Sequence, residues 1–188
     1  MLDTYARPVA APFFDKTATK LLAYNLSATH ITIIGFFIGL TGLFAVALGA
    51  YIPGLIFLLI SRFLDGVDGA AARVTQLTPF GTYLDNAVRW ITHAGFVLFF
   101  SMSLAEQSLA SALLLFTYML MIVTASVRTQ TDKPGFSFGG LIGETELIVF
   151  MVLCCLSPGS FAGIAVLFAV LCAITALGRL CDAAKNLR

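Results

Sequence analysis

Three aspartates lie in stretches of sequence that are otherwise apolar. Asp65 and Asp68 are three residues apart and so share one face of a helix, and Asp85 follows after the short connection VTQLTP. Carboxylate oxygens suit a hard cation such as Mg²⁺ or Mn²⁺, and Mg²⁺ in proteins usually joins a few carboxylates to the phosphates of a substrate. Because the connection is short, we expect two antiparallel neighbouring helices whose three carboxylates converge on a cation that holds a diphosphate.

Further charged and ionisable side chains accompany these acids. Asp85, Arg89 and His93 recur every four residues along one helical stripe, and Arg62 stands one turn before Asp65. A charge at the centre of a membrane helix costs about 2.5 to 3.5 kcal/mol, so a group of charges needs partners. The chemistry alone leaves two alternatives to a metal site open: a buried ion network neutralised by the arginines, and an ion or proton pathway.

Small residues surround the first two acids. Gly66, Gly69 and the three alanines at 70–72 leave this stretch almost without side-chain bulk. Small residues let another helix or a ligand approach the backbone closely. We therefore expect the carboxylates to stand beside an open groove.

The elements that must position these residues are membrane helices. Of the 188 residues, 59% are hydrophobic and only 11% are charged, and the mean hydropathy is +0.95, which is not the balance of a soluble domain. A helix needs about 20 apolar residues to cross a bilayer, and the sequence supplies such stretches repeatedly between Gly, Pro and Ser turns. We predict an all-α integral membrane protein, with one domain over residues 1–188 and six transmembrane helices at about 31–49, 53–73, 80–102, 109–127, 141–156 and 161–180.

A further helix is predicted before the first span. Residues 13–24 place Phe14, Ala18, Leu21 and Leu22 on one face at helical spacing, with charged residues elsewhere. This pattern is typical of an amphipathic juxtamembrane helix that lies on the membrane surface.

The distribution of cations predicts the orientation in the membrane. Lys and Arg precede the first span, end the second, follow the fourth and close the chain, whereas the connections GAYIPG, SLAEQS and SPGS contain none. We therefore expect both termini to face the cytoplasm. The net charge of only +1 gives no reason to expect nucleic acid as a partner, and membrane lipids are the expected surroundings.

The order of residues on the two charged helices resembles the signature of the CDP-alcohol phosphatidyltransferase family. That signature reads D-x-x-D-G-x-x-A-R, a spacer, and G-x-x-x-D-x-x-x-D. The matching positions in this sequence are Asp65, Asp68, Gly69, Ala72, Arg73, Gly81 and Asp85. Six membrane helices and a juxtamembrane helix also match the family, although only residues 62–85 are diagnostic.

The resemblance implies a function. It implies a transferase that moves a substituted phosphate group from a CDP-alcohol, such as CDP-diacylglycerol, to an acceptor alcohol in phospholipid biosynthesis and releases CMP. It further implies Mg²⁺ or Mn²⁺ as cofactor, a homodimer, and an active site on the cytoplasmic side of what we expect to be a bacterial cytoplasmic membrane. On this basis the metal ligands are Asp65, Asp68 and Asp85, and the CDP-binding residues are Asp65, Asp68, Gly69, Ala72, Arg73 and Gly81.

The sequence departs from the family pattern at its last position. Arg89 stands where the family has the aspartate that is read as metal ligand and general base, and the spacer before Gly81 is short. A guanidinium stays protonated, so Arg89 can be neither a metal ligand nor a general base. Three interpretations remain: His93 serves as the base instead, the chain binds its ligand without turnover, or one position of an otherwise active enzyme is altered.

Two residues are candidates for binding the acceptor. Arg128 follows the fourth span on the predicted cytoplasmic side, and Glu146 lies at the start of the fifth. Each also has an equally good structural explanation. Arg128 can be read as an ordinary positive-inside anchor, and Glu146 as an acid favoured at a helix N-terminus. Two other functions also stay open: a non-catalytic relative that binds a CDP-alcohol or lipid, and an ion or solute transporter, although no internal repeat of the transporter kind is evident.

Overall fold

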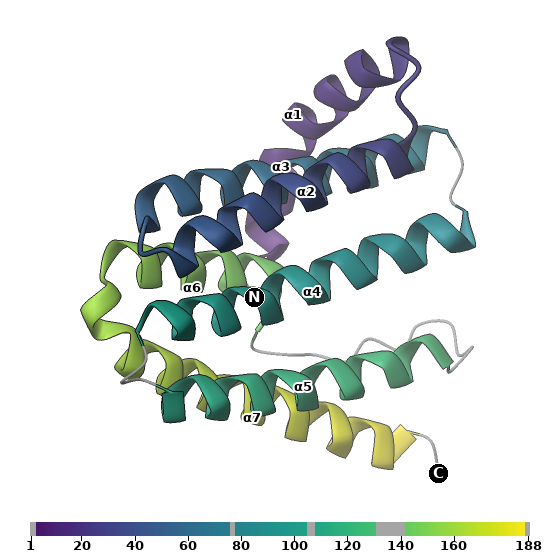
Figure 1. Cartoon of the computed structure of the whole chain (residues 1–188). Coiled ribbons are helices and arrows are strands. Elements are labelled where there is room, and N and C mark those ends of the chain that lie inside the picture. Colours follow the sequence, from purple (N-terminus) through teal and green to yellow (C-terminus); the bar gives the residue numbers. More distant parts are fainter. Residues whose placement is uncertain (1–2, 76–77, 105–107, 131–141, 187–188) are drawn as a thin grey trace. The chain divides into compact units, whose positions relative to one another are not determined.

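The computed structural model describes residues 3–75, 78–104, 108–130 and 142–186, and this part of the chain is helical without a strand (Figure 1). The all-α prediction is therefore confirmed for the described residues. The elements in chain order are α1 (Asp3–Ala23), α2 (Ala28–Ala47), α3 (Tyr51–Val74), α4 (Pro79–Ser103), α5 (Ser108–Gln130), α6 (Glu144–Leu156), the 3₁₀ helix η2 (Pro158–Ser160) and α7 (Phe161–Asn186).

The six predicted spans correspond to helices α2 to α7. Most of their limits agree within a few residues, while α7 continues beyond the predicted end at 180 and residue 141 lies outside the described part. Two helical stretches, Ala28–Ala47 and Pro158–Cys181, are long and apolar enough to cross a membrane. α3 has 24 residues, about 36 Å of helix, but its charged residues lower its hydropathy. The number of six spans stays a prediction.

The chain divides into two compact units. One is Thr4–Ser103 and holds α1 to α4, and the other contains Leu104–Arg188. In the first unit α2 packs against both α3 and α4. All three aspartates of the sequence motif belong to this unit, so it positions the candidate site.

Glycines let α2 and α3 approach each other closely. A Cβ atom at Gly42 would lie 2.9 Å from the carbonyl oxygen of Gly54, and one at Gly39 would lie 2.7 Å from the Ser61 hydroxyl. Gly35 comes similarly close to Leu64. Small residues at such spacing allow the backbones of membrane helices to pack directly. This packing fixes the face of α3 that carries the acids.

α1 is longer than the predicted helix at 13–24, and its apolar face packs onto α3. Ala18 is fully buried in a cluster with Val67 and Ala70, and Phe14 lies beside this cluster. The Phe14 ring covers Gly66, where a Cβ atom would lie 2.6 Å from the ring. The predicted face of α1 is thus used for packing within this unit. Its position on a membrane surface stays a prediction.

The unit that contains Leu104–Arg188 is held together by α5 and α7 and by a few polar bonds. The Arg179 guanidinium donates from Nη1 to the carbonyl oxygen of Met121 at 3.1 Å, and the backbone N–H of Ile142 donates to the Thr175 hydroxyl at 3.3 Å. The rings of Phe150 and Phe168 lie 4.6 Å apart between centroids. These contacts join the middle of α5, the residue Ile142 before α6, and α6 itself to α7.

Candidate active site and metal centre

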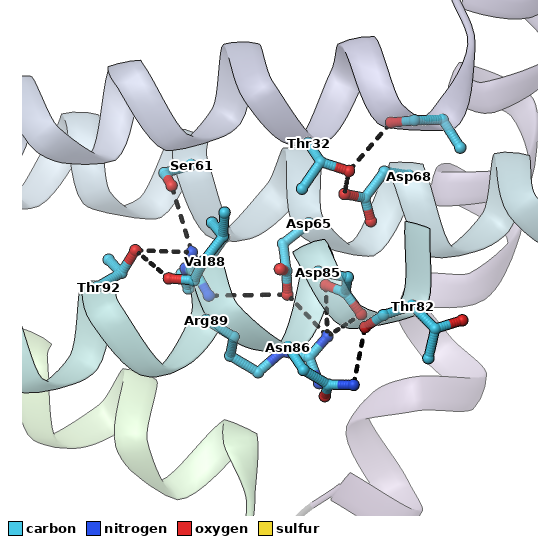
Figure 2. Close-up of polar contacts among 12 residues, drawn as sticks. Thr32, Ser61, Asp65, Asp68, Thr82, Asp85, Asn86, Val88, Arg89 and Thr92 are labelled. Carbon is cyan, nitrogen blue, oxygen red and sulfur yellow. Dashed lines mark hydrogen bonds and ion pairs between the residues drawn. The ribbon is translucent and has the colours of Figure 1, made fainter. Parts of the chain in front are cut away.

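The three aspartates converge as the sequence predicted. Asp65 and Asp68 come from α3 and Asp85 from the first turns of α4, and one carboxylate oxygen of each lies within 4.8 Å of the others (Figure 2). Asp65 and Asp68 are buried, with 8% and 3% of their surface exposed, whereas the Asp85 side chain is about a quarter exposed. The arrangement presents converging oxygen donors of the kind that a divalent cation uses.

Arg89 bridges two of these carboxylates. Its Nη2 atom donates to Oδ1 and Oδ2 of Asp85 at 3.0 and 3.1 Å and lies 3.4 Å from Oδ2 of Asp65 (Figure 2). Arg89 and Asp85 are one helical turn apart on α4, whereas Asp65 lies on α3. The guanidinium therefore joins the two helices at the point where their acids meet.

Arg62 approaches Asp65 from the preceding turn of α3. Its Nη1 atom lies 3.7 Å from Oδ2 of Asp65, and its Nη2 atom donates weakly to the hydroxyls of Ser61 and Thr92 at 3.4 and 3.5 Å. Arg62 is 6% exposed, so its charge is compensated inside the bundle. An ion network with Arg62 and Arg89, one of the alternatives open from the sequence, is thus present around the same acids.

Asp68 has a different partner, which sequence reasoning missed. The Thr32 hydroxyl on α2 donates to Oδ2 of Asp68 and also lies 3.0 Å from the carbonyl oxygen of Ala28 (Figure 2). The one hydroxyl proton is shared between these two acceptors. A threonine in an apolar span gives little warning of such a role, because Thr commonly bonds the carbonyl four residues earlier.

His93 lies one turn beyond Arg89 and is 4% exposed. Its Nδ1 atom is 2.8 Å from the carbonyl oxygen of Arg89. A carbonyl only accepts hydrogen bonds, so Nδ1 carries the hydrogen and Nε2 is the ring nitrogen that could accept a proton.

The small residues of the motif have two different environments. A Cβ atom at Gly69 would meet only the end of the Arg73 side chain, at 3.9 Å, so the backbone is open there. Gly66, by contrast, is covered by Phe14. Of the two possibilities left by the sequence, a helix approaches Gly66, and space for a ligand remains at Gly69.

The other CDP-binding candidates lie in the last turn of α3 and the first turn of α4. Ala72 is half-buried, and the exposed Arg73 lies 3.5 Å from Asp15 of α1, Nη2 to Oδ1. The backbone N–H of Gly81 donates to the Thr78 hydroxyl at 3.0 Å, which orders the first turn of α4.

The acceptor-binding candidates lie in the other unit. Glu146 accepts a hydrogen bond from the backbone N–H of Gly143 at 3.0 Å, which caps the N-terminus of α6. Arg128 lies in α5, and its side chain is outside the described residues. The acceptor role of both residues stays a prediction.

The three carboxylates fit a hard divalent cation, but two arginines already pair with some of their oxygens. Three carboxylates and the guanidiniums of Arg62 and Arg89 sum to a formal charge of −3 + 2 = −1, so the cluster retains attraction for a cation. The Arg89 guanidinium, however, already pairs with oxygens of Asp65 and Asp85. A cation that uses the same oxygens of Asp65 and Asp85 competes with Arg89 for them.

Three acids that converge from two helices form a donor set of the kind that metal-dependent enzymes use. The chain belongs to the CDP-alcohol phosphatidyltransferase family, whose model matches residues 25–176. This match includes the acidic cluster and α2 to α6 in full. The resemblance read from the signature residues is confirmed.

Sequence relatives extend over almost the whole chain. The inner membrane protein YnjF of Escherichia coli is 34% identical over 192 residues, which cover 95% of this chain and 93% of that protein. An archaetidylinositol phosphate synthase of Pyrococcus horikoshii is 26% identical, with 96% of each chain covered. Together with the two long apolar helices, the membrane relative indicates an integral membrane protein.

Solved structures share the fold. The phosphatidylinositol phosphate synthase of Mycobacterium tuberculosis with bound CDP-DAG has a TM-score of 0.79 at 23% identity, covering 90% of this chain and 92% of that one. The same synthase in complex with manganese and citrate has a TM-score of 0.80 at 22% identity, covering 92% and 89%. At these identities the likeness concerns the fold.

Proposed function

We propose that this protein transfers a substituted phosphate group from a CDP-alcohol, CDP-diacylglycerol in the first instance, to an acceptor alcohol and releases CMP. The convergence of Asp65, Asp68 and Asp85 from two helices carries the proposal, because these acids occupy the motif positions of the family to which the chain belongs. The synthase relatives that act in this chemistry support the same reaction.

The three aspartates hold one or more divalent cations, Mg²⁺ or Mn²⁺. Bound there, a cation neutralises charge on the donor diphosphate and stabilises the leaving CMP. The open backbone at Gly69 and the end of the Arg73 side chain lie beside the acids on α3, where the cytidine diphosphate would bind together with Ala72 and Gly81. An acceptor hydroxyl then attacks the β-phosphorus, and the bond from that phosphorus to CMP breaks.

The proton of the acceptor hydroxyl needs a base other than Arg89. A guanidinium cannot accept it. The sequence candidate is His93, whose Nε2 would carry the lone pair because Nδ1 donates to the Arg89 carbonyl. We propose that Arg128 and Glu146 contribute to binding of the acceptor.

We further propose that the chain crosses the membrane six times. The site, both termini and helix α1 then lie on the cytoplasmic side.

A turnover assay tests the reaction. Purified protein with Mn²⁺ or Mg²⁺, labelled CDP-diacylglycerol and a panel of alcohol acceptors should release CMP with at least one acceptor. Asp68→Ala should abolish release, because it removes an oxygen donor from the cluster. Nucleotide binding without CMP release from any acceptor would instead identify a non-catalytic relative, and metal-independent release would reject the site.

His93→Gln tests the base. Gln retains a polar side chain but cannot take up the proton, so turnover should fall by roughly 100- to 10,000-fold, the usual contribution of general base catalysis. Binding of CDP should stay unchanged in calorimetry. Turnover within a few-fold of the wild type would exclude His93 as the base, and equal loss of nucleotide binding would show a structural role.

A further inference from the structure

The Arg89 guanidinium bridges two of the three acids that would hold a cation. It contacts both oxygens of Asp85 and one oxygen of Asp65, at 3.0 to 3.4 Å. These contacts bridge α3 and α4, as a cation bound to the acids of both helices would. A side chain and a divalent cation cannot occupy the same carboxylate oxygens in the same way at once, so the two compete.

The third acid is not engaged in this way. Asp68 accepts from the neutral Thr32 hydroxyl, and no arginine of the described residues is within ion-pair distance of it. An incoming cation thus meets one carboxylate without a competing guanidinium and two carboxylates that are paired with Arg89. Entry at Asp68 followed by displacement of Arg89 is the order that these contacts favour.

A displaced guanidinium needs a new anionic partner, and a diphosphate on the cation provides it. A cation that joins carboxylates to phosphates places phosphate oxygens next to the carboxylates that Arg89 has left. Arginine pairs with phosphate oxygens through two parallel hydrogen bonds. With the cation bound, the cluster rises from a formal charge of −1 to −1 + 2 = +1, which favours an anionic ligand.

We propose that Arg89 is a built-in competitor of the divalent cation, released from Asp65 and Asp85 when the cation binds and then paired with the donor diphosphate. Cation and diphosphate therefore bind cooperatively, and without the metal Arg89 neutralises part of the negative charge of the acids. This inference rests on the proposed metal site. It gives the residue that replaces the family's last aspartate a role in coupling two ligands, in place of the base function.

Equilibrium binding tests the proposal without turnover. Mn²⁺ binding to purified protein is measured by electron paramagnetic resonance with and without CDP, with free Mn²⁺ corrected for its complex with the nucleotide. Arg89→Gln should bind Mn²⁺ alone roughly 5- to 150-fold more tightly than the wild type, the usual range of such coupling. The gain in Mn²⁺ affinity on adding CDP should be smaller in the variant. Lys20→Gln removes one exposed positive charge from α1 and should behave as the wild type.

The outcomes separate this proposal from the proposed function. Equal Mn²⁺ affinity of the wild type and Arg89→Gln, with metal-dependent CDP binding in both, overturns the role of Arg89 and leaves the metal site intact. No Mn²⁺ binding in either protein, even with CDP, overturns the metal site and with it this inference. Should Arg89→Gln not fold, Arg89→Met decides, because methionine also removes the positive charge: tighter Mn²⁺ binding than in the wild type supports competition, and no gain overturns it.

Discussion

At the scale of single residues, the three aspartates are chemically different although the motif treats them alike. Asp65 pairs with two arginines and Asp85 pairs with Arg89. Asp68 instead accepts a hydrogen bond from a neutral hydroxyl on α2. Hydrogen bonds of this kind orient a ligand carboxylate, and their loss typically costs 10- to 100-fold in metal affinity. The orientation of Asp68 therefore depends on a residue of α2, far from the motif in sequence.

Thr32→Val tests this dependence. Valine keeps the shape of threonine but leaves the buried Asp68 without the hydroxyl donor, so Mn²⁺ affinity should fall by about 10-fold or more. Thr32→Ser retains the hydroxyl and should bind Mn²⁺ nearly as the wild type does. Titration of both variants decides the matter, and wild-type affinity of Thr32→Val would show that the hydrogen bond is not needed for the site.

At the scale of helices, glycines on α2 decide how the acid-bearing helix is held. The close approach at Gly42 involves the backbone of Gly54 and the Leu58 side chain, so an added methyl group cannot be accommodated by a side-chain rotation alone. Gly178 on α7 has nothing within 4 Å of an added Cβ atom. The two glycines thus offer a matched comparison on helices of the same protein.

Gly42→Ala should destabilise the protein, while Gly178→Ala should not. The crowding at Gly42 should cost about 1 to 3 kcal/mol and lower the thermal midpoint in detergent. Gly178→Ala should be neutral or stabilising by up to about 1 kcal/mol, because alanine favours helix more than glycine does. Circular dichroism measures both midpoints. A Gly42→Ala midpoint at or above that of Gly178→Ala would contradict the tight α2–α3 packing.

At the scale of the whole molecule, the sequence pattern and the helices both support a chain that crosses a membrane. Cations at the chain termini and at Arg73 contrast with the connection at residues 48–50, which has none. Positive charge is retained in the cytoplasm during insertion. The acids lie towards the end of α3 and the beginning of α4, on the Arg73 side, so the proposed orientation predicts a site near the cytoplasm.

Reporter fusions test this orientation. Green fluorescent protein attached to the C-terminus should fluoresce, and alkaline phosphatase attached there should be inactive, because the proposed six spans return the chain to the cytoplasm. Alkaline phosphatase fused after Gly49, beyond the end of α2, should be active, because this connection should lie outside the cytoplasm. The opposite pattern at both positions would invert the membrane topology and move the proposed site to the outer face.

The sequence by itself determined the helices and the family. Long apolar stretches broken by Gly, Pro and Ser gave nearly the observed bounds of α2 to α7, since hydrophobicity and turn residues act locally. The spacing of Asp65, Asp68 and Asp85 predicted their convergence, because helical periodicity and a short connection leave few arrangements. Only the tertiary structure decided which partners these acids have on other helices. Thr32 comes from another helix, Arg89 reaches across to α3, and Phe14 rather than a ligand covers Gly66. Such contacts join residues far apart in sequence, and close helix packing, which local patterns do not encode, selects them.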